Sequence, residues 1–102
     1  MKSSNDNASK TPVFDNVLAA LAATYTGADR WTAEGWAEHI RGARHANHAI
    51  NSLVKHADEF GPAVWPAVFV LTVARCVDAG LPSEEAAAEI HARRAARTLR
   101  AA

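Results

Sequence analysis

The stretch Ala67-Val-Phe-Val-Leu-Thr-Val-Ala-Arg-Cys-Val-Asp-Ala79 decides the fold of this chain. It is apolar almost all the way round a helix, in a chain of only 102 residues. Such a helix cannot face water, so neighbouring helices or a second copy must cover it. We therefore expect a helix from about 66 to 79, ended by Gly80, to lie at the centre of the molecule.

A first helix is expected before this segment, from about 12 to 25. Thr11 is a suitable N-cap, and Pro12 fits the first position of a helix. Apolar side chains then recur at helical spacing as far as Tyr25. Gly27 follows the last of them and indicates the end of the helix.

A second helix is expected from about 33 to 59. Thr32 is its predicted cap, and Trp31 and Trp36 have the spacing of a hydrophobic staple. Gly42 and Asn47 are poor helix-interior residues, so a kink or a break is expected near one of them.

A fourth helix is expected from about 84 to 100, capped by Ser83. Acidic side chains fill its first turn and arginines its second half, which suits the helix dipole. A smooth face of alanines with Leu99 is expected to pack on the bundle. The sequence thus predicts an all-α fold, a small four-helix bundle over residues 11–102, after a disordered tail at 1–10.

Charge and cysteine content narrow the classes of function. Eleven basic and eleven acidic residues balance, which gives no overall attraction to nucleic acid or membrane. The one cysteine, Cys76, excludes an internal disulfide and suits a reducing cytoplasm. No apolar run is long enough for a membrane span, so we expect a cytoplasmic protein with no membrane contact.

Basic side chains gather on the predicted second and fourth helices. They indicate a surface for an acidic partner, to which Trp65 and Val68 are added as apolar contacts from the central helix. One side of that helix is expected to stay partly bare, which suggests a homodimer or a docking site formed by Val64, Trp65, Val68 and Leu71. The predicted partner-binding residues are Arg41, Arg44, His48, Lys55, Trp65, Val68, Arg93, Arg97 and Arg100.

The sequence gives less support to a metal site, a catalytic site or a DNA-binding motif than to a binding surface. His45 and His48 are placed to reach one ion from one helix face, but two histidines do not complete a site. Cys76 lies among apolar residues, which is typical of an inert thiol. Residues 74–89 loosely resemble a helix-turn-helix, yet Glu84 and Glu85 would face phosphates there. No cofactor, metal or catalytic residue is predicted.

The function expected from the sequence is that of a small non-enzymatic helical binding or regulatory protein. An adaptor, an accessory subunit or an inhibitor encoded by a mobile element would each act through stoichiometric protein–protein contact. The alternative is a nucleic-acid-binding regulator that uses the same arginines.

Overall fold

The computed structural model describes residues 10–101, and within them the chain is all-helical, with five α-helices and one 3-10 turn. The elements are α2 (Pro12–Thr24), α3 (Gly27–Arg41), α4 (Ala46–His56), η1 (Ala57–Glu59), α5 (Trp65–Asp78) and α6 (Ser83–Ala101). The all-α prediction is confirmed, whereas the count of four helices is wrong. The predicted disordered tail falls, apart from Lys10, outside the described residues.

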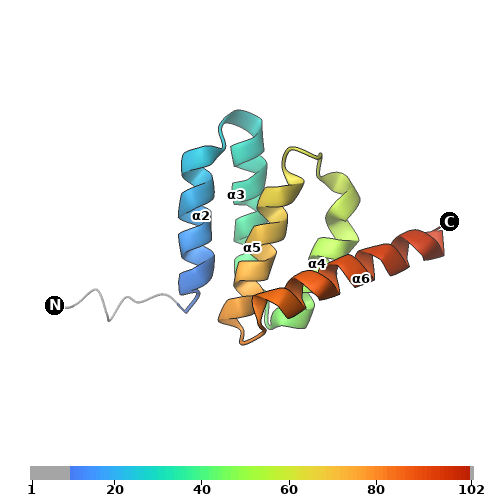
Figure 1. Cartoon of the computed structure of the whole chain (residues 1–102). Helices are drawn as coiled ribbons and strands as arrows, with labels where there is room; N and C mark the ends of the chain where they lie inside the picture. Colours follow the sequence, from blue (N-terminus) through green and yellow to red (C-terminus); the bar gives the residue numbers. More distant parts are fainter. Residues whose placement is uncertain (1–9, 102) are drawn as a thin grey trace.

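Helix α5 is the central helix, in contact with α2, α3, α4 and α6. Figure 1 shows α2, α3 and α5 running alongside one another, with α6 starting near the lower end of α5 and running outward past α4. The end of α5 has the expected glycine: Gly80 has a φ of +99°, and the Leu81 N–H donates to the Cys76 carbonyl at 3.0 Å. This is a Schellman motif, so Gly80 stops α5 as predicted.

The inward face of α5 differs from the expected one. Val68 and Leu71 are 0% exposed and Val64 is buried, whereas Val70 is 37% exposed, so the surface predicted from these residues and Trp65 is not formed. The neighbouring Thr72 suggested a polar side, but it is 0% exposed too. Its hydroxyl accepts a hydrogen bond from Trp36 Nε1 at 3.0 Å and donates one to the Val68 carbonyl at 2.8 Å. A buried hydroxyl with both partners fits a core without penalty.

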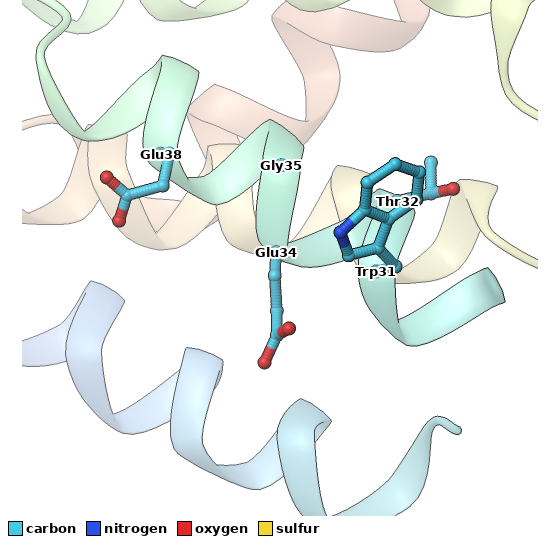
Figure 2. A pocket seen from close by; sticks show the side chains of 5 residues that line it. All are labelled: Trp31, Thr32, Glu34, Gly35 and Glu38. Carbon is cyan, nitrogen blue, oxygen red and sulfur yellow. The ribbon is translucent and has the colours of Figure 1, made fainter. Parts of the chain in front are cut away.

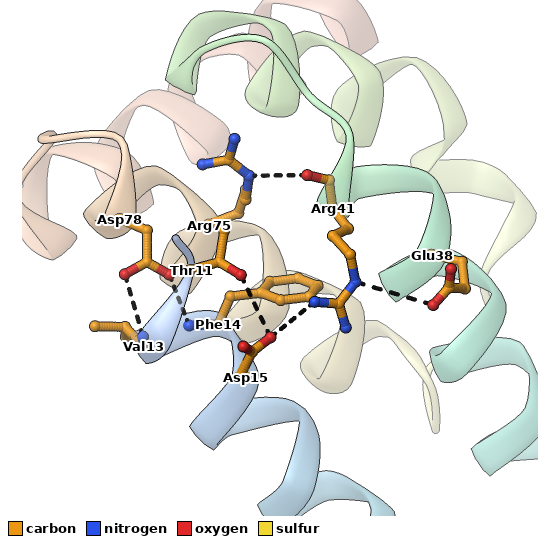
Figure 3. Close-up of polar contacts among 8 residues, drawn as sticks. All are labelled: Thr11, Val13, Phe14, Asp15, Glu38, Arg41, Arg75 and Asp78. Atoms are coloured by element: carbon orange, nitrogen blue, oxygen red, sulfur yellow. Dashed lines mark hydrogen bonds and ion pairs between the residues drawn. The ribbon is translucent and has the colours of Figure 1, made fainter. Parts of the chain in front are cut away.

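The first helix is capped from a distance. Thr11 makes no cap hydrogen bond with its side chain. Instead, the two carboxylate oxygens of Asp78, at the end of α5, accept from the backbone N–H groups of Val13 at 3.1 Å and Phe14 at 2.9 Å (Figure 3). Because Pro12 has no N–H, these are the first donors that α2 must satisfy. A carboxylate there also complements the helix dipole.

The predicted second helix is two helices. Helix α3 already begins at Gly27, whose φ of +61° lets the chain turn sharply after α2. Thr32 is therefore an interior residue rather than a cap, and its hydroxyl donates to the Ala28 carbonyl at 2.9 Å. Trp31 and Trp36 then lie on different faces of one helix, because five residues turn the helix by about 140° beyond a full turn. The predicted staple is therefore wrong.

The break falls at Gly42, one of the two positions expected, and Arg75 stabilises it from α5. Its Nη2 donates to the Ala43 carbonyl at 2.7 Å. Its Nε donates to the Arg41 carbonyl at 3.4 Å, the contact drawn in Figure 3. Carbonyls at a helix end have no partner within the helix, and a guanidinium is a suitable donor for them. The chain then restarts at α4, capped by the His45 Nδ1, which accepts from the His48 N–H at 3.1 Å.

Helix α6 packs on the bundle through a different face from the one expected. Ala86 and Ile90 are its buried side chains, while Ala88, Ala92 and Ala95 are exposed and Leu99 is 78% exposed. The expected alanine face therefore points to solvent. The side facing the bundle carries Arg93 and Arg94, whose long side chains are half-buried.

Candidate functional site: the α4–α6 surface

Arg93 is the link that fixes α6 against α4. Its Nη1 donates to Asn47 Oδ1 and to Asn51 Oδ1, each at 2.7 Å, and its Nε lies 2.9 Å from Glu89 Oε1. The two amides come from one face of α4, one turn apart. Because Nε and Nη1 already have acceptors, most of the guanidinium is engaged within the fold, so Arg93 positions the surface.

Two hollows lie along this junction. One, of about 420 Å³, is lined by Asn51, Val54, Lys55, Arg93, Ala96 and Arg97. The other, of about 380 Å³, is lined by His39, His45, Asn47, His48, Asn51, Ser52, Lys55 and His56. They share Asn51 and Lys55, so they form one continuous region. We call the part carried by His48, Asn51, Lys55, Arg93 and Arg97 the α4–α6 surface.

The electrostatic character of the α4–α6 surface is positive. No carboxylate lines either hollow. Lys55 and Arg97 are exposed, and among the described residues neither has a hydrogen bond or an ion pair. Glu89, the nearest acid on α6, is already paired with Arg93. Two unpaired cations beside amide donors on rigid helices are suited to holding an anionic group.

A group of histidines borders this surface, and the sequence analysis missed part of it. The break at Gly42 lets the chain reverse into α4, which brings the rings of His39 and His56 to 6.2 Å between centroids. His39 Nε2 lies 2.9 Å from Ser52 Oγ, and His56 Nδ1 lies 2.6 Å from Glu59 Oε2. The two rings can meet only if the chain reverses at Gly42, because a continuous helix would keep them more than four turns apart. The break at Gly42 was therefore the only sequence signal for this contact.

No metal centre results from this arrangement. His45 and His48 are neighbours, with 6.1 Å between ring centroids, but the Nδ1 of His45 is already used to cap α4. Across residues 10–101, no group of three or more His, Cys, Asp or Glu side chains is placed to hold a metal ion.

The other predicted binding residues lie elsewhere. Arg41 is fixed by Asp15, with Nη1 2.8 Å from Oδ1, and its guanidinium lies 5.0 Å from the ring centre of Phe14 (Figure 3). The ring of Trp65 is covered by Arg94, with 4.2 Å between the guanidinium carbon and the ring centre. Val68 is in the core, which removes it as a contact residue.

Two predicted residues remain. Arg44 is exposed in the link before α4 and lines neither hollow, so its role stays a prediction. The side chain of Arg100 lies outside the described residues. The structure thus brings together His48, Lys55, Arg93 and Arg97 from the predicted set.

The single thiol does not contribute to a site. Cys76 is buried, with Sγ 3.7 Å from the Ala46 carbonyl oxygen. Desolvation by burial raises the pKa of this thiol from 9.0 to about 11, against the smaller opposing effects of Arg75 and Arg93. A thiol of this kind stays protonated at neutral pH and is a poor nucleophile.

Comparison of the chain with family models, with curated proteins and with solved structures finds no match. Within residues 10–101, none of the helices combines the length and the apolar character that crossing a bilayer requires.

Proposed function

We propose that this chain is a small non-enzymatic binding or regulatory protein that docks an acidic segment of a partner protein on the α4–α6 surface. An adaptor, an accessory subunit or an inhibitor encoded by a mobile element would work in this way. The supporting observation is that Lys55 and Arg97 line one hollow, without a carboxylate among its lining residues.

The rigidity of the surface favours stoichiometric binding. Lys55 projects from α4 and Arg97 from α6, and Arg93 joins these two helices through Asn47 and Asn51. Because the cations sit on helices that are already linked, little ordering is required when an anionic segment binds. Complementary charge of this kind raises the association rate and selects the partner.

The number of free cations argues for a protein rather than a nucleic acid. Proteins that bind duplex DNA tightly neutralise roughly 6–10 phosphates. The α4–α6 surface offers two unpaired cations, Lys55 and Arg97, in a chain whose formal net charge is zero. An acidic peptide segment needs fewer contacts, so the nucleic-acid reading remains the second choice.

A binding experiment with charge reversals tests this proposal. The probes are a fluorescent peptide of about 15 residues rich in Asp and Glu, and a duplex of about 20 base pairs. Lys55→Glu/Arg97→Glu is expected to weaken peptide binding at least about tenfold, since two attractive contacts become repulsive. Lys10→Glu/Ala20→Glu/Ala23→Glu, an equal change of net charge at exposed positions that line no hollow, is the matched control.

Equal affinity of the variant and its control for the peptide would contradict the proposal, as would the absence of peptide binding to the unchanged protein at low salt. Tighter binding of the duplex, with a steep dependence on salt that disappears in Lys55→Glu/Arg97→Glu, would favour the nucleic-acid alternative.

A further inference from the structure

The outward face of α3 carries a tryptophan that the fold does not use. Trp31 is 78% exposed, although Trp36 on the same helix is 6% exposed and hydrogen-bonded in the core. Figure 2 shows Trp31 lying along the outside of α3, with Thr32 and Gly35 next to it. Large exposed aromatic side chains are unfavourable in water and are the residue type most enriched at binding hot spots.

One turn further along the same face, Gly35 is also unexplained by the fold. Glycine in a helix interior is less stable than alanine, because it loses more backbone freedom on folding. A Cβ added at Gly35 would meet nothing within 4 Å, and its φ is not in the left-handed region. Neither internal packing nor backbone conformation therefore requires a glycine at this position. The close approach of another chain would explain it, because a glycine lets a partner's atoms come near the helix backbone.

Between these two residues lies a hollow of about 440 Å³, lined by Trp31, Thr32, Glu34, Gly35 and Glu38 (Figure 2). Its two charged lining residues are both acidic. Glu34 lies 3.1 Å from Arg30, while Glu38 is 3.9 Å from Arg41, whose guanidinium is already held by Asp15 at 2.8 Å. The carboxylate of Glu38 is therefore available to a cation from outside.

We propose that this face of α3, which we call the Trp31 notch, is a second docking surface, and that it takes an amphipathic basic helix of a partner protein. A large aliphatic side chain of the partner fills the space over Gly35 and packs against Trp31. A neighbouring Lys or Arg pairs with Glu38. The Trp31 notch is acidic and the α4–α6 surface is basic, so the two select different partners, and the notch does not depend on the function proposed above.

The test uses the full chain and two synthetic helical peptides. One carries Leu on one face and Lys beside it, and the other is identical except that Glu replaces Lys. The Lys peptide is expected to shift the NMR signals of the Trp31 indole and the Gly35 amide. Trp31→Ala and Gly35→Gln are each expected to weaken its binding about tenfold or more, measured by fluorescence anisotropy.

Gly35→Gln keeps this test independent of folding. Because the space at Gly35 is open and glutamine is a better helix former than glycine, the melting temperature of this variant should stay the same or rise while binding falls. Lys55→Glu/Arg97→Glu is the second control and should leave binding of the Lys peptide unchanged. A failure at the notch is thus distinguishable from a failure at the α4–α6 surface.

The proposal is wrong if the Lys peptide causes no shift at the notch, if both notch variants bind it as the unchanged protein does, or if the Glu peptide binds equally well. Signals of Trp31 that move with protein concentration alone would identify the occupant as a second copy, which also overturns the assignment to a basic partner helix.

Discussion

The junction of α2, α3 and α5 and the α4–α6 surface both carry basic side chains, but they use them differently. At the junction, Arg41 is fixed to Asp15, and Arg75 donates to the carbonyls that end α3. On the α4–α6 surface, Lys55 and Arg97 have no such acceptors among the described residues. The difference teaches that the number of cations on a helix does not by itself indicate a binding surface, because acceptors inside the fold can already hold them.

The largest expected effect is a difference in stability between substitutions on the buried face and on the exposed face of α5. Val68→Lys should lower the free energy of unfolding by more than about 4 kcal/mol, because it places an unpaired charge in the core. Val70→Lys, two residues away at a position 37% exposed, should change it by less than about 1 kcal/mol. Thermal unfolding followed by circular dichroism measures both. Similar melting temperatures for the two variants would refute the assignment of faces.

The buried thiol gives the next effect. The pKa of Cys76 is raised from 9.0 to about 11, so the unfolded chain loses this proton at a lower pH than the folded chain. Stability from this group is complete below pH 9 and is lost as pH rises toward 11, by about 2–3 kcal/mol in all. Urea unfolding of Cys76→Ala, compared with the unchanged protein across this pH range, isolates the effect. Parallel pH profiles of the two proteins would show that the thiol is not desolvated.

The distant cap of α2 tests the junction directly. Asp78→Ala removes the acceptor of the Val13 and Phe14 N–H groups and should cost about 1–3 kcal/mol of stability. Asp58→Ala, at an exposed position in η1, should stay within about 0.5 kcal/mol. Chemical denaturation supplies both values. If the two variants were equally stable, Asp78 would not be the cap.

The smallest effect compares two arginines of α6. Arg93→Ala should destabilise the protein by about 1–2 kcal/mol, because two amide acceptors on α4 lose their charged donor. Arg97→Ala should leave stability within about 0.5 kcal/mol but weaken binding of the acidic peptide. Denaturation and anisotropy on both variants separate the roles. If Arg97→Ala proved more destabilising than Arg93→Ala, the assignment of Arg93 as the structural link and Arg97 as the binding residue would be wrong.

The presence of the helices could be predicted from local sequence, but which face of each helix is buried could not. The pattern around 66–79 and Gly80 predicts α5 to within one residue of its observed start and end. On that helix, however, the side of Val68 and Leu71, which also carries Thr72 and Arg75, was expected to stay partly bare. Both polar side chains found partners inside, with Trp36 and the end of α3, so the polar stripe of α5 is its buried one.

The candidate site was predictable to a similar extent. His48, Lys55, Arg93 and Arg97 were identified from their charge and helical spacing, and the structure places them together. The anchoring role of Arg93 was not predictable, because its acceptors lie 46 and 42 residues away. The exposure of Trp31 was missed for a different reason, since the helix was expected to start at about 33, after Trp31, whereas α3 starts at Gly27.

The sequence by itself determined that this chain is helical and that its most apolar segment lies inside, since both follow from periodicity, caps and the cost of exposing apolar surface to water. Only the tertiary structure decided which side of each helix is inside. That choice depends on which long polar side chains find acceptors on other helices, and such acceptors are set by packing across the chain rather than by neighbours in sequence.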